Sequence, residues 1–181
     1  VFDGGRPSWF PPELDWIIGC TYDGFAARKT DVRNIHGCNM SFRRENLTRI
    51  GGFNELLGSK SGSSLAGEET ELCLRLRKRY PEFRILYDPA CIVHHTVPRS
   101  RQTIERLLER AYREGVSKAI ISRLHTQNDA KLSTEKTYLN QLISRTIPQR
   151  LMTIKPEDKA QLAAILLTLC SVGIGYCKER I

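Results

Sequence analysis

A charge-free run near the end of the chain limits what it can fold into. Residues 162–176, LAAILLTLCSVGIGY, contain no Asp, Glu, Lys or Arg. As a helix rising 1.5 Å per residue the run spans roughly 22 Å, less than the ~30 Å hydrocarbon core of a bilayer. By length alone it predicts a buried or re-entrant helix. Lys178 and Arg180 follow directly, the flank expected on the cytoplasmic side, so a membrane-dipping or truncated membrane helix is the alternative.

The net charge of +8 is unevenly distributed. Residues 1–98 carry 13 Lys and Arg against 12 Asp and Glu, whereas residues 99–181 carry 15 against 8. A near-neutral body with a basic tail indicates an anionic partner, either a membrane surface, a phosphate or nucleic acid, unless the tail is simply a solvated basic face. The tail has no interleaved exposed aromatics and no recognisable reading motif, so we expect no nucleic-acid partner.

Residues 102–124 predict an amphipathic helix interrupted by Gly115. Its two faces separate apolar residues (Ile104, Leu107, Leu108, Ala111, Tyr112) from basic ones (Arg106, Arg110, Arg113, Lys118). A helix of this kind suits a membrane surface, and it equally suits packing on a domain with its charges in water. We therefore expect three parts: a domain over 1–98, a basic helical extension over 99–150 and an apolar membrane-proximal segment over 151–181. The opening VFDGGRPSWFPPELDW reads like the middle of a protein, so we expect a fragment.

Apolar runs and helical patterns alternate through the first hundred residues. WIIGC (16–20) suits a buried strand, residues 32–42 continue a strand-like pattern, and residues 84–95 suit two short strands around Asp88 and Pro89. Between them, RRENLTRIGGF (43–53) and GEETELCLRLRKRY (67–80) predict helices, the first ended by two glycines and the second followed by Pro81. This alternation predicts the α/β class.

Two side-chain pairs could carry chemistry. Glu68 and Glu69 open the helix over 67–80, where the helix N-terminus favours ionised carboxylates, so one of them could act as a general base. Acidic residues in a first turn are also common without any catalytic role. His94 and His95 end a predicted strand and should point to opposite faces, so only one can face a given site. That imidazole could bind a metal together with carboxylates elsewhere, or could be a hydrogen-bonded structural histidine.

Taken in order, two segments resemble the second half of a family-2 glycosyltransferase. They are GCNMSFRRENLTRIGGFNELLG and GEETELCLRLRKRYPEFRILYDPACIVHHTVPRSRQT. RPSWFPPELDWIIGCTY (6–22) and AYREGVSKAIISRL (111–124) look like a subgroup that includes glucosyl-dolichyl-phosphate glucuronosyltransferases. The resemblance implies the acceptor-side half of a GT-A fold, an α/β fold, in an enzyme that is usually inverting.

The resemblance also implies roles for individual residues. Glu69 matches the general base that deprotonates the acceptor, with Glu68 as a supporting carboxylate. Gly37 and Asn39 match the segment that lines the sugar and acceptor pocket. His95 matches the histidine that helps to hold the donor's metal and diphosphate, with His94 as the runner-up. Arg99 and Arg101 follow it and are expected to bind substrate.

The same resemblance implies partners and a cofactor. We expect a nucleotide-sugar donor, a lipid-phosphate or glycan acceptor, and a divalent cation, Mg²⁺ or Mn²⁺. Members of the family carry a preceding half-domain with a D-x-D metal motif, and no Asp-x-Asp occurs in this sequence. The cation would therefore be shared with that other half. We expect peripheral or single-anchor association with the cytoplasmic face of the cell membrane. The competing interpretation is a non-catalytic basic module that binds a membrane surface.

Overall fold

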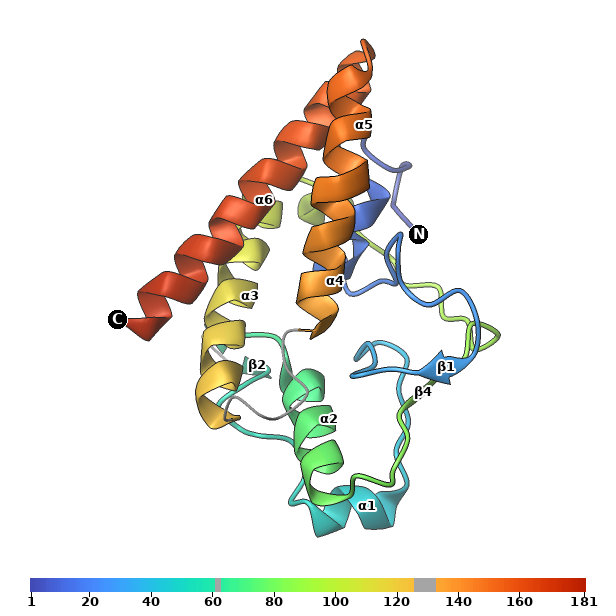
Figure 1. Ribbon diagram of the computed structural model, residues 1–181, viewed down its shortest axis with the longest axis vertical. Helices are drawn as coiled ribbons and strands as arrows, with labels where there is room; N and C mark the ends of the chain where they lie inside the picture. The colour runs from blue at the N-terminus through green and yellow to red at the C-terminus, as the bar shows by residue number, and fades with distance from the viewer. Residues whose placement is uncertain (61–62, 126–132) are drawn as a thin grey trace.

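The structure is a computed structural model that describes residues 1–60, 63–125 and 133–181. These residues are mostly helical (Figure 1). The two longest helices, α3 (Ile104–Leu124) and α6 (Pro156–Arg180), pack along each other. Between them in sequence, α4 (Ser133–Gln141), the π-helix η3 (Leu142–Thr146) and α5 (Ile147–Met152) follow one another without a break, because Gln141 and Thr146 keep helical backbone angles.

The proline-rich N-terminal segment forms a short 3₁₀ helix, η1 (Pro12–Ile18). It begins directly after Pro11 and ends at Gly19, whose φ of 79° is readily adopted by glycine. The predicted buried strand over 16–20 is therefore wrong. A five-residue apolar run fits a buried helix turn as well as a strand, and here Pro12 at the first helical position sets the helical φ.

Two predicted helices of the first hundred residues are confirmed. α1 (Arg44–Arg49) is followed by Gly51 and Gly52, both with positive φ, and α2 (Glu68–Arg79) ends before Pro81. Within α2, Arg75 forms an ion pair with Glu71 at 2.9 Å. The same guanidinium donates to the carbonyl of Gly52 at 2.7 Å, and so ties α2 to the turn after α1.

The strands are much shorter than predicted. β1 (Thr30–Asp31) pairs antiparallel with β4 (Leu86–Tyr87), and β2 (Ser59–Lys60) pairs antiparallel with β3 (Ser63–Ser64). Residues 32–42 and 88–95 contain no strand, although Asn39 Nδ2 donates to the carbonyl of Cys91 at 2.7 Å and holds these segments together. A strand needs a partner for its N–H and C=O groups, and these segments find only isolated bonds. The described residues thus agree with the α/β prediction only in part, and they show no sheet layer of a GT-A fold.

α3 runs through Gly115 without the predicted interruption. Gly115 lies where α3 and α6 touch backbone to backbone: a Cβ there would stand 2.1 Å from the carbonyl oxygen of Val172. On α6, a Cβ at Gly175 would stand 2.1 Å from the carbonyl oxygen of Tyr112. These glycines therefore permit a close helix crossing. A tertiary contact, invisible in the local pattern, explains the glycine in mid-helix.

The main hydrophobic core joins segments that are far apart in the sequence. It contains residues from the N-terminal segment, α3, η3 and α6, so it draws on each of the three parts expected from the sequence. Its buried members are Phe10, Leu14, Ile17, Ile18, Val97, Leu107, Ala111, Leu142, Ala164 and Ile165. Because α3 and α6 share this core with η1, the helical part forms a fixed wall beside the start of α2.

Candidate functional site

A cavity of about 780 Å³ lies between the start of α2, η1, α3, α4 and the C-terminal half of α6. Its walls differ in chemistry. Carboxylates come from α2, α3 and α4, two histidines come from the loops, basic side chains come mainly from α3, and apolar side chains come from η1, α4 and α6. Of the residues predicted to form a site, the cavity brings together Gly37, Glu68, Glu69, His95 and Arg101.

The start of α2 is held against α3 by close contacts. The N–H of Ala66 donates to the hydroxyl of Ser117, a fully buried residue of α3, at 3.1 Å. Gly67 caps α2 with a φ of 93°, and a Cβ there would lie 2.9 Å from Ile121. These contacts leave little freedom in where Glu68 and Glu69 begin the helix.

Glu69 is half-buried in the cavity wall and contacts Gly37. Its Oε1 accepts a hydrogen bond from the N–H of Gly37 at 3.3 Å, and a Cβ at Gly37 would stand 3.4 Å from that oxygen. Burial raises the pKa of Glu69, and the neighbouring Glu68 carboxylate adds to the rise. The helix N-terminus alone would favour the ionised form, as expected from the sequence, but burial outweighs it. A carboxylate with a raised pKa is a stronger base once ionised.

Asn39 lies outside the cavity wall, unlike Gly37. Its side-chain amide instead bridges to the carbonyl of Cys91. In the structure, Asn39 thus positions the backbone on which Gly37 sits. Its predicted contact with substrate stays a prediction.

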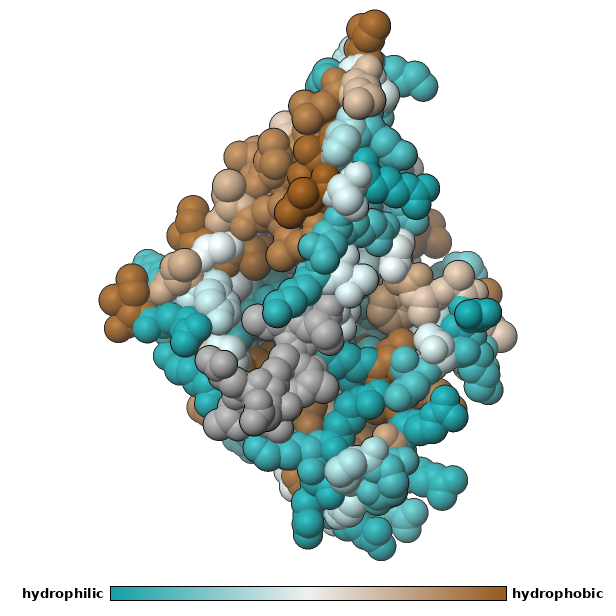
Figure 2. Space-filling model, in the orientation of Figure 1, coloured by the Kyte–Doolittle hydropathy of each residue, from teal (hydrophilic) through white to brown (hydrophobic). Residues whose placement is uncertain are grey.

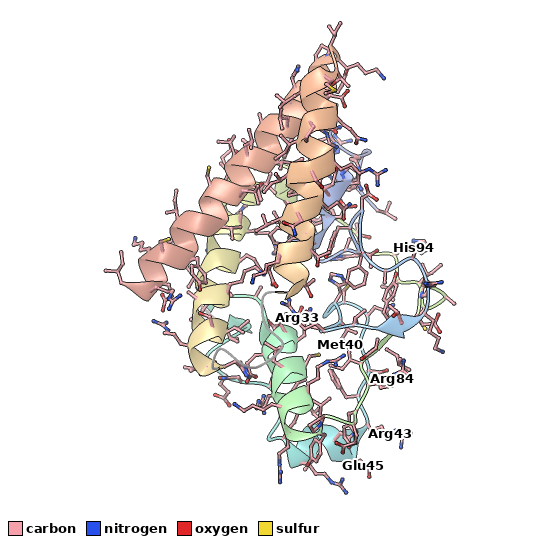
Figure 3. The ribbon with its side chains drawn as sticks, viewed as in Figure 1. Arg33, Met40, Arg43, Glu45, Arg84 and His94 are labelled. Carbon is pink, nitrogen blue, oxygen red and sulfur yellow. The ribbon has the colours of Figure 1, made fainter. Side chains whose placement is uncertain are left out.

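His95 lines the cavity and His94 does not. The Nδ1 of His95 lies 3.7 Å from the Sγ of Cys20, and its carbonyl accepts a hydrogen bond from the amino terminus of Val1. His94 is exposed at the outer edge of the molecule (Figure 3). The two imidazoles therefore have different surroundings, although strand alternation is not the reason, because residues 88–95 form no strand. A role for His95 in binding stays a prediction.

A divalent cation would not find a complete site among the described residues. Residues 1–60, 63–125 and 133–181 contain no group of three His, Cys, Asp or Glu side chains placed to hold a metal ion. His95 offers one nitrogen, and its neighbour Cys20 has a pKa raised by burial, which disfavours the thiolate that a metal would bind. The residues described here do not fit a bound Mg²⁺ or Mn²⁺ on their own.

Three arginines lie near one another among the residues that line the cavity. Arg101, Arg110 and Arg113 all line it, and Arg110 Nε donates to the carbonyl of Ile17 at 2.7 Å. Burial lowers the pKa of Arg110, and the guanidinium groups of Arg101 and Arg113 add to this effect. Concentrated positive charge of this kind favours an anionic ligand such as a phosphate. Arg99 lies outside the cavity, with its side chain 78% exposed and 4.0 Å from Asp3.

A half-buried ion cluster that sequence reasoning missed lines the same cavity. Lys118 on α3 contacts Glu135 on α4 at 2.9 Å and Glu114 at 3.1 Å, and Arg33 pairs with Glu135 as well. Burial opposes ionisation of Glu135, but the charges of Lys118 and Arg33 lower its pKa to about 2. Figure 3 shows Arg33 close to the lower end of α4. The i, i+4 spacing of Glu114 and Lys118 was the one sequence feature that could have indicated this ion pair. The contact with Glu135 of α4 could not be predicted from spacing, because Glu135 lies too far along the sequence.

The remaining walls are largely apolar. Trp16 donates its indole N–H to the hydroxyl of Tyr138 at 3.0 Å, and that hydroxyl donates to the carbonyl of Glu13 at 3.0 Å. From α6, Leu169, Val172 and Tyr176 face the cavity. The cavity therefore combines carboxylates, guanidinium groups and apolar side chains within one space.

Comparison with known proteins gives one clear similarity. No protein-family model matches the chain, and no solved structure matches it. The chain is 29% identical over 175 residues to a curated glucosyl-dolichyl phosphate glucuronosyltransferase of Haloferax volcanii. The alignment covers 94% of this chain and 55% of that protein, so the chain spans about half the length of the relative. The similarity supports a relationship to glycosyltransferases.

Proposed function

We propose that the chain is the acceptor-side part of an inverting, family-2 glycosyltransferase with a GT-A fold. The enzyme would move a sugar from a nucleotide-sugar donor to a lipid-linked acceptor, a polyprenyl or dolichyl phosphate or a glycan carried on one. The observation that carries this proposal is a single cavity holding Glu69, a cluster of arginines and an apolar wall. The relative supports it, because its name describes glucuronosyl transfer and glucosyl-dolichyl phosphate.

Glu69 is the proposed general base. Its carboxylate would accept the proton of an acceptor hydroxyl as that oxygen attacks the anomeric carbon of the donor sugar. The bond between that carbon and the nucleoside diphosphate breaks on the opposite face, and the diphosphate leaves with the bonding electron pair. The N–H of Gly37 orients the Glu69 carboxylate for this step. Glu68 lies one residue earlier, about 100° away around the helix, so it would not reach the same hydroxyl. Its carboxylate would act as a supporting negative charge beside Glu69.

The arginines and the apolar wall match the two chemical parts of a lipid phosphate. Arg101, Arg110 and Arg113 would pair with phosphate oxygens of the acceptor or donor. Leu169, Val172 and Tyr176 on α6 offer contacts to a hydrocarbon chain. A ligand that is anionic at one end and apolar at the other would contact both the arginines and the apolar side chains. A free sugar has neither an anionic group nor a hydrocarbon chain for these contacts. His95 would contribute one contact to the donor's diphosphate or its cation, and the steps above do not depend on that cation.

Membrane association belongs to the same proposal. One described helix, α6, is long and apolar enough by length and composition to cross a membrane. We place the protein on the cytoplasmic face of the cell membrane, where nucleotide sugars are made available, by peripheral or single-anchor attachment. The alternative of a non-catalytic basic surface module is not favoured, because the relative is named as a transferase.

The test is turnover by the complete enzyme with glucosyl-phosphoryl dolichol and a nucleotide-activated glucuronic acid. Glu69→Gln keeps the size of the side chain and removes its basicity, so kcat should fall by about 10²–10⁴-fold with little change in KM. Glu68→Gln should lose less, and Glu45→Gln, an exposed glutamate on α1 far from the cavity, serves as the matched control (Figure 3).

The pH profile sharpens this test. Since the pKa of Glu69 is raised, its ionised fraction and hence kcat/KM should fall as the pH drops through that raised value, earlier than for an ordinary glutamate. The acidic limb should persist in Glu68→Gln. Near-full turnover of Glu69→Gln with an inactive Glu68→Gln would place the base at the other carboxylate. Full turnover of both variants would remove the start of α2 from the mechanism.

A further inference from the structure

α6 has two faces of opposite environment. Leu162, Ile165 and Thr168 are buried on the side toward α3 and the core. The other side is exposed and carries no charge between Lys159 and Lys178. Its exposed residues between the flanking lysines are Ala160, Ala163, Leu166, Leu167, Cys170, Gly173, Ile174 and Cys177. Figure 2 shows hydrophobic side chains gathered along this helix.

The exposed apolar surface continues beyond the start of the helix. Leu151 and Met152 at the end of α5 are 58% and 83% exposed, and Ile154 in the turn before α6 is 95% exposed. A contiguous apolar patch on a solvent-exposed face of a protein marks an interaction surface. On α6 alone it follows the i, i+3, i+4, i+7 spacing of one helix face, from Ala160 to Cys177.

Basic residues flank this face at both ends. Lys155 and Lys159 are exposed near the first turn of α6, and Lys178 and Arg180 are exposed in its last turn. Glu179, between the latter two, is neutralised by an ion pair with Arg123 of α3. Glu157 and Asp158 lie in the first turn, where the free N–H groups of the helix offset their charge. An apolar strip bounded by lysine and arginine is complementary to anionic headgroups above acyl chains.

The buried face argues against α6 crossing a bilayer. Gly115 and Gly175 bring the backbones of α3 and α6 into direct contact, and Ser171 donates its hydroxyl to the carbonyl of Leu108 at 2.8 Å. A spanning α6 would have to leave α3 or take it along. Leaving would expose the buried face of α3 and the cavity wall, and moving together would carry the arginines and glutamates of α3 into hydrocarbon.

We propose that α6 lies flat in the headgroup region of an anionic lipid surface, with its exposed apolar face toward the acyl chains. The proposal deepens the proposed function, since a lipid-linked acceptor would then be presented beside the cavity wall that α6 forms. Its occupant is a lipid surface. A second copy of the chain on the same face is the competing outcome of the test below.

Three positions at heptad spacing measure the orientation directly. Ala163, Cys170 and Cys177 are exposed on the same face of α6 and are separated by one heptad each. Spin labels would be attached in variants that each keep one accessible thiol, using Ala163→Cys for the first position. The protein is bound to vesicles of phosphatidylcholine with phosphatidylglycerol at low salt, and label depth is read from relaxation by oxygen and by a water-soluble nickel chelate. Cys91, exposed in a loop away from α6, is the control site.

A flat helix places the three labels at one shallow depth, and the label at Cys91 in water. A spanning helix separates the labels at 163 and 177 by roughly 20 Å along the membrane normal, with the label at 170 between them, and that result would overturn the proposal. Labels at all three sites in water, with dipolar broadening between copies, would also overturn it in favour of a dimer.

A pair of substitutions tests the same face without labels. Leu166→Glu with Leu167→Glu should lower partitioning onto the vesicles by about tenfold or more, because it removes two apolar contacts and adds two like charges toward an anionic surface. Ile92→Glu, at a site 72% exposed outside α6, should leave partitioning unchanged. Equal loss in both variants would overturn the proposal.

Turnover of a short-chain, water-soluble acceptor separates this proposal from the proposed function. A flat helix without any turnover would refute only the proposed activity. Turnover with a spanning helix or a dimer would refute only the placement of α6.

Discussion

The close crossing of α3 and α6 can be tested by adding one methyl group. Gly175→Ala would place a Cβ 2.1 Å from the carbonyl oxygen of Tyr112, which is closer than any real contact allows. The two backbones would have to separate by about 1.3 Å or more to reach an ordinary van der Waals distance. Separation loosens the core around Ala164 and Ile165 and shifts the α6 wall of the cavity. Overpacking of this kind costs about 1–3 kcal/mol.

Gly173→Ala provides the matched control two residues earlier on the same helix. No atom lies within 4 Å of a Cβ at that position, so alanine adds no clash and gains up to about 1 kcal/mol of helix propensity. The two variants should therefore differ by about 1–4 kcal/mol in the free energy of unfolding. For a chain of this length, 3 kcal/mol corresponds to roughly 6–12 °C in Tm.

The assay is thermal or urea unfolding of both variants, monitored through the helical signal in far-UV circular dichroism. The reasoning predicts that Gly175→Ala unfolds well below the wild type and Gly173→Ala at or above it. If the two alanine variants unfold together, the helices do not cross at Gly175, and the glycine serves no packing purpose.

Two further predictions concern the cavity wall. Glu135→Gln should destabilise the fold by about 3 kcal/mol, because it leaves Lys118 and Arg33 without their shared carboxylate. Glu109→Gln on the exposed side of α3 should change the stability little. The pKa of Glu135 is lowered to about 2, so its contribution to the free energy of unfolding should be complete above the ordinary glutamate pKa and lost as the pH falls toward 2. Measuring the free energy of unfolding against pH in the wild type and in Glu135→Gln checks this. Parallel pH dependences in the two proteins would contradict it. His95→Ala should lower turnover by about tenfold through loss of one charged hydrogen bond or ligand, while His94→Ala on the outer edge should not; equal rates in both variants would contradict the assignment.

Local signals explain which elements could be predicted from the sequence. α1 and α2 were predictable because their ends are marked by Gly51, Gly52 and Pro81, and α2 also has its Glu71–Arg75 pair. The run over 16–20 was misassigned because an apolar segment of five residues satisfies a strand and a buried helical turn equally. Gly115 was misread for a different reason. Its lack of a side chain allows α6 to pack closely against α3, and α6 begins more than forty residues further along the chain.

The candidate site likewise combines residues that the local sequence predicts with contacts that form only between distant segments. The resemblance singled out Glu69 and His95 from the two side-chain pairs, and both line the same cavity in the structure. The ion cluster of Lys118, Glu135 and Arg33 could not be predicted, because its members approach each other only after α3 and α4 have packed. Asn39 and Arg99 were expected to bind substrate and lie outside the cavity, because the Asn39 amide is bonded to the carbonyl of Cys91 and the Arg99 side chain extends into solvent near Asp3.

The direction of the Glu69 pKa shows why a site needs its surroundings as well as its residues. A helix N-terminus favours the ionised carboxylate, and that argument from sequence alone predicts a low pKa. In the fold, the same carboxylate is covered by the Gly37 segment and faces Glu68 and Glu114, so desolvation and like charge dominate. Only packing decides between these opposing effects, because the start of α2 is pressed against Ser117 and Ile121 of α3. Any change that separates α3 from α2 should therefore lower the pKa of Glu69 toward its ordinary value and shift the acidic limb of turnover to lower pH.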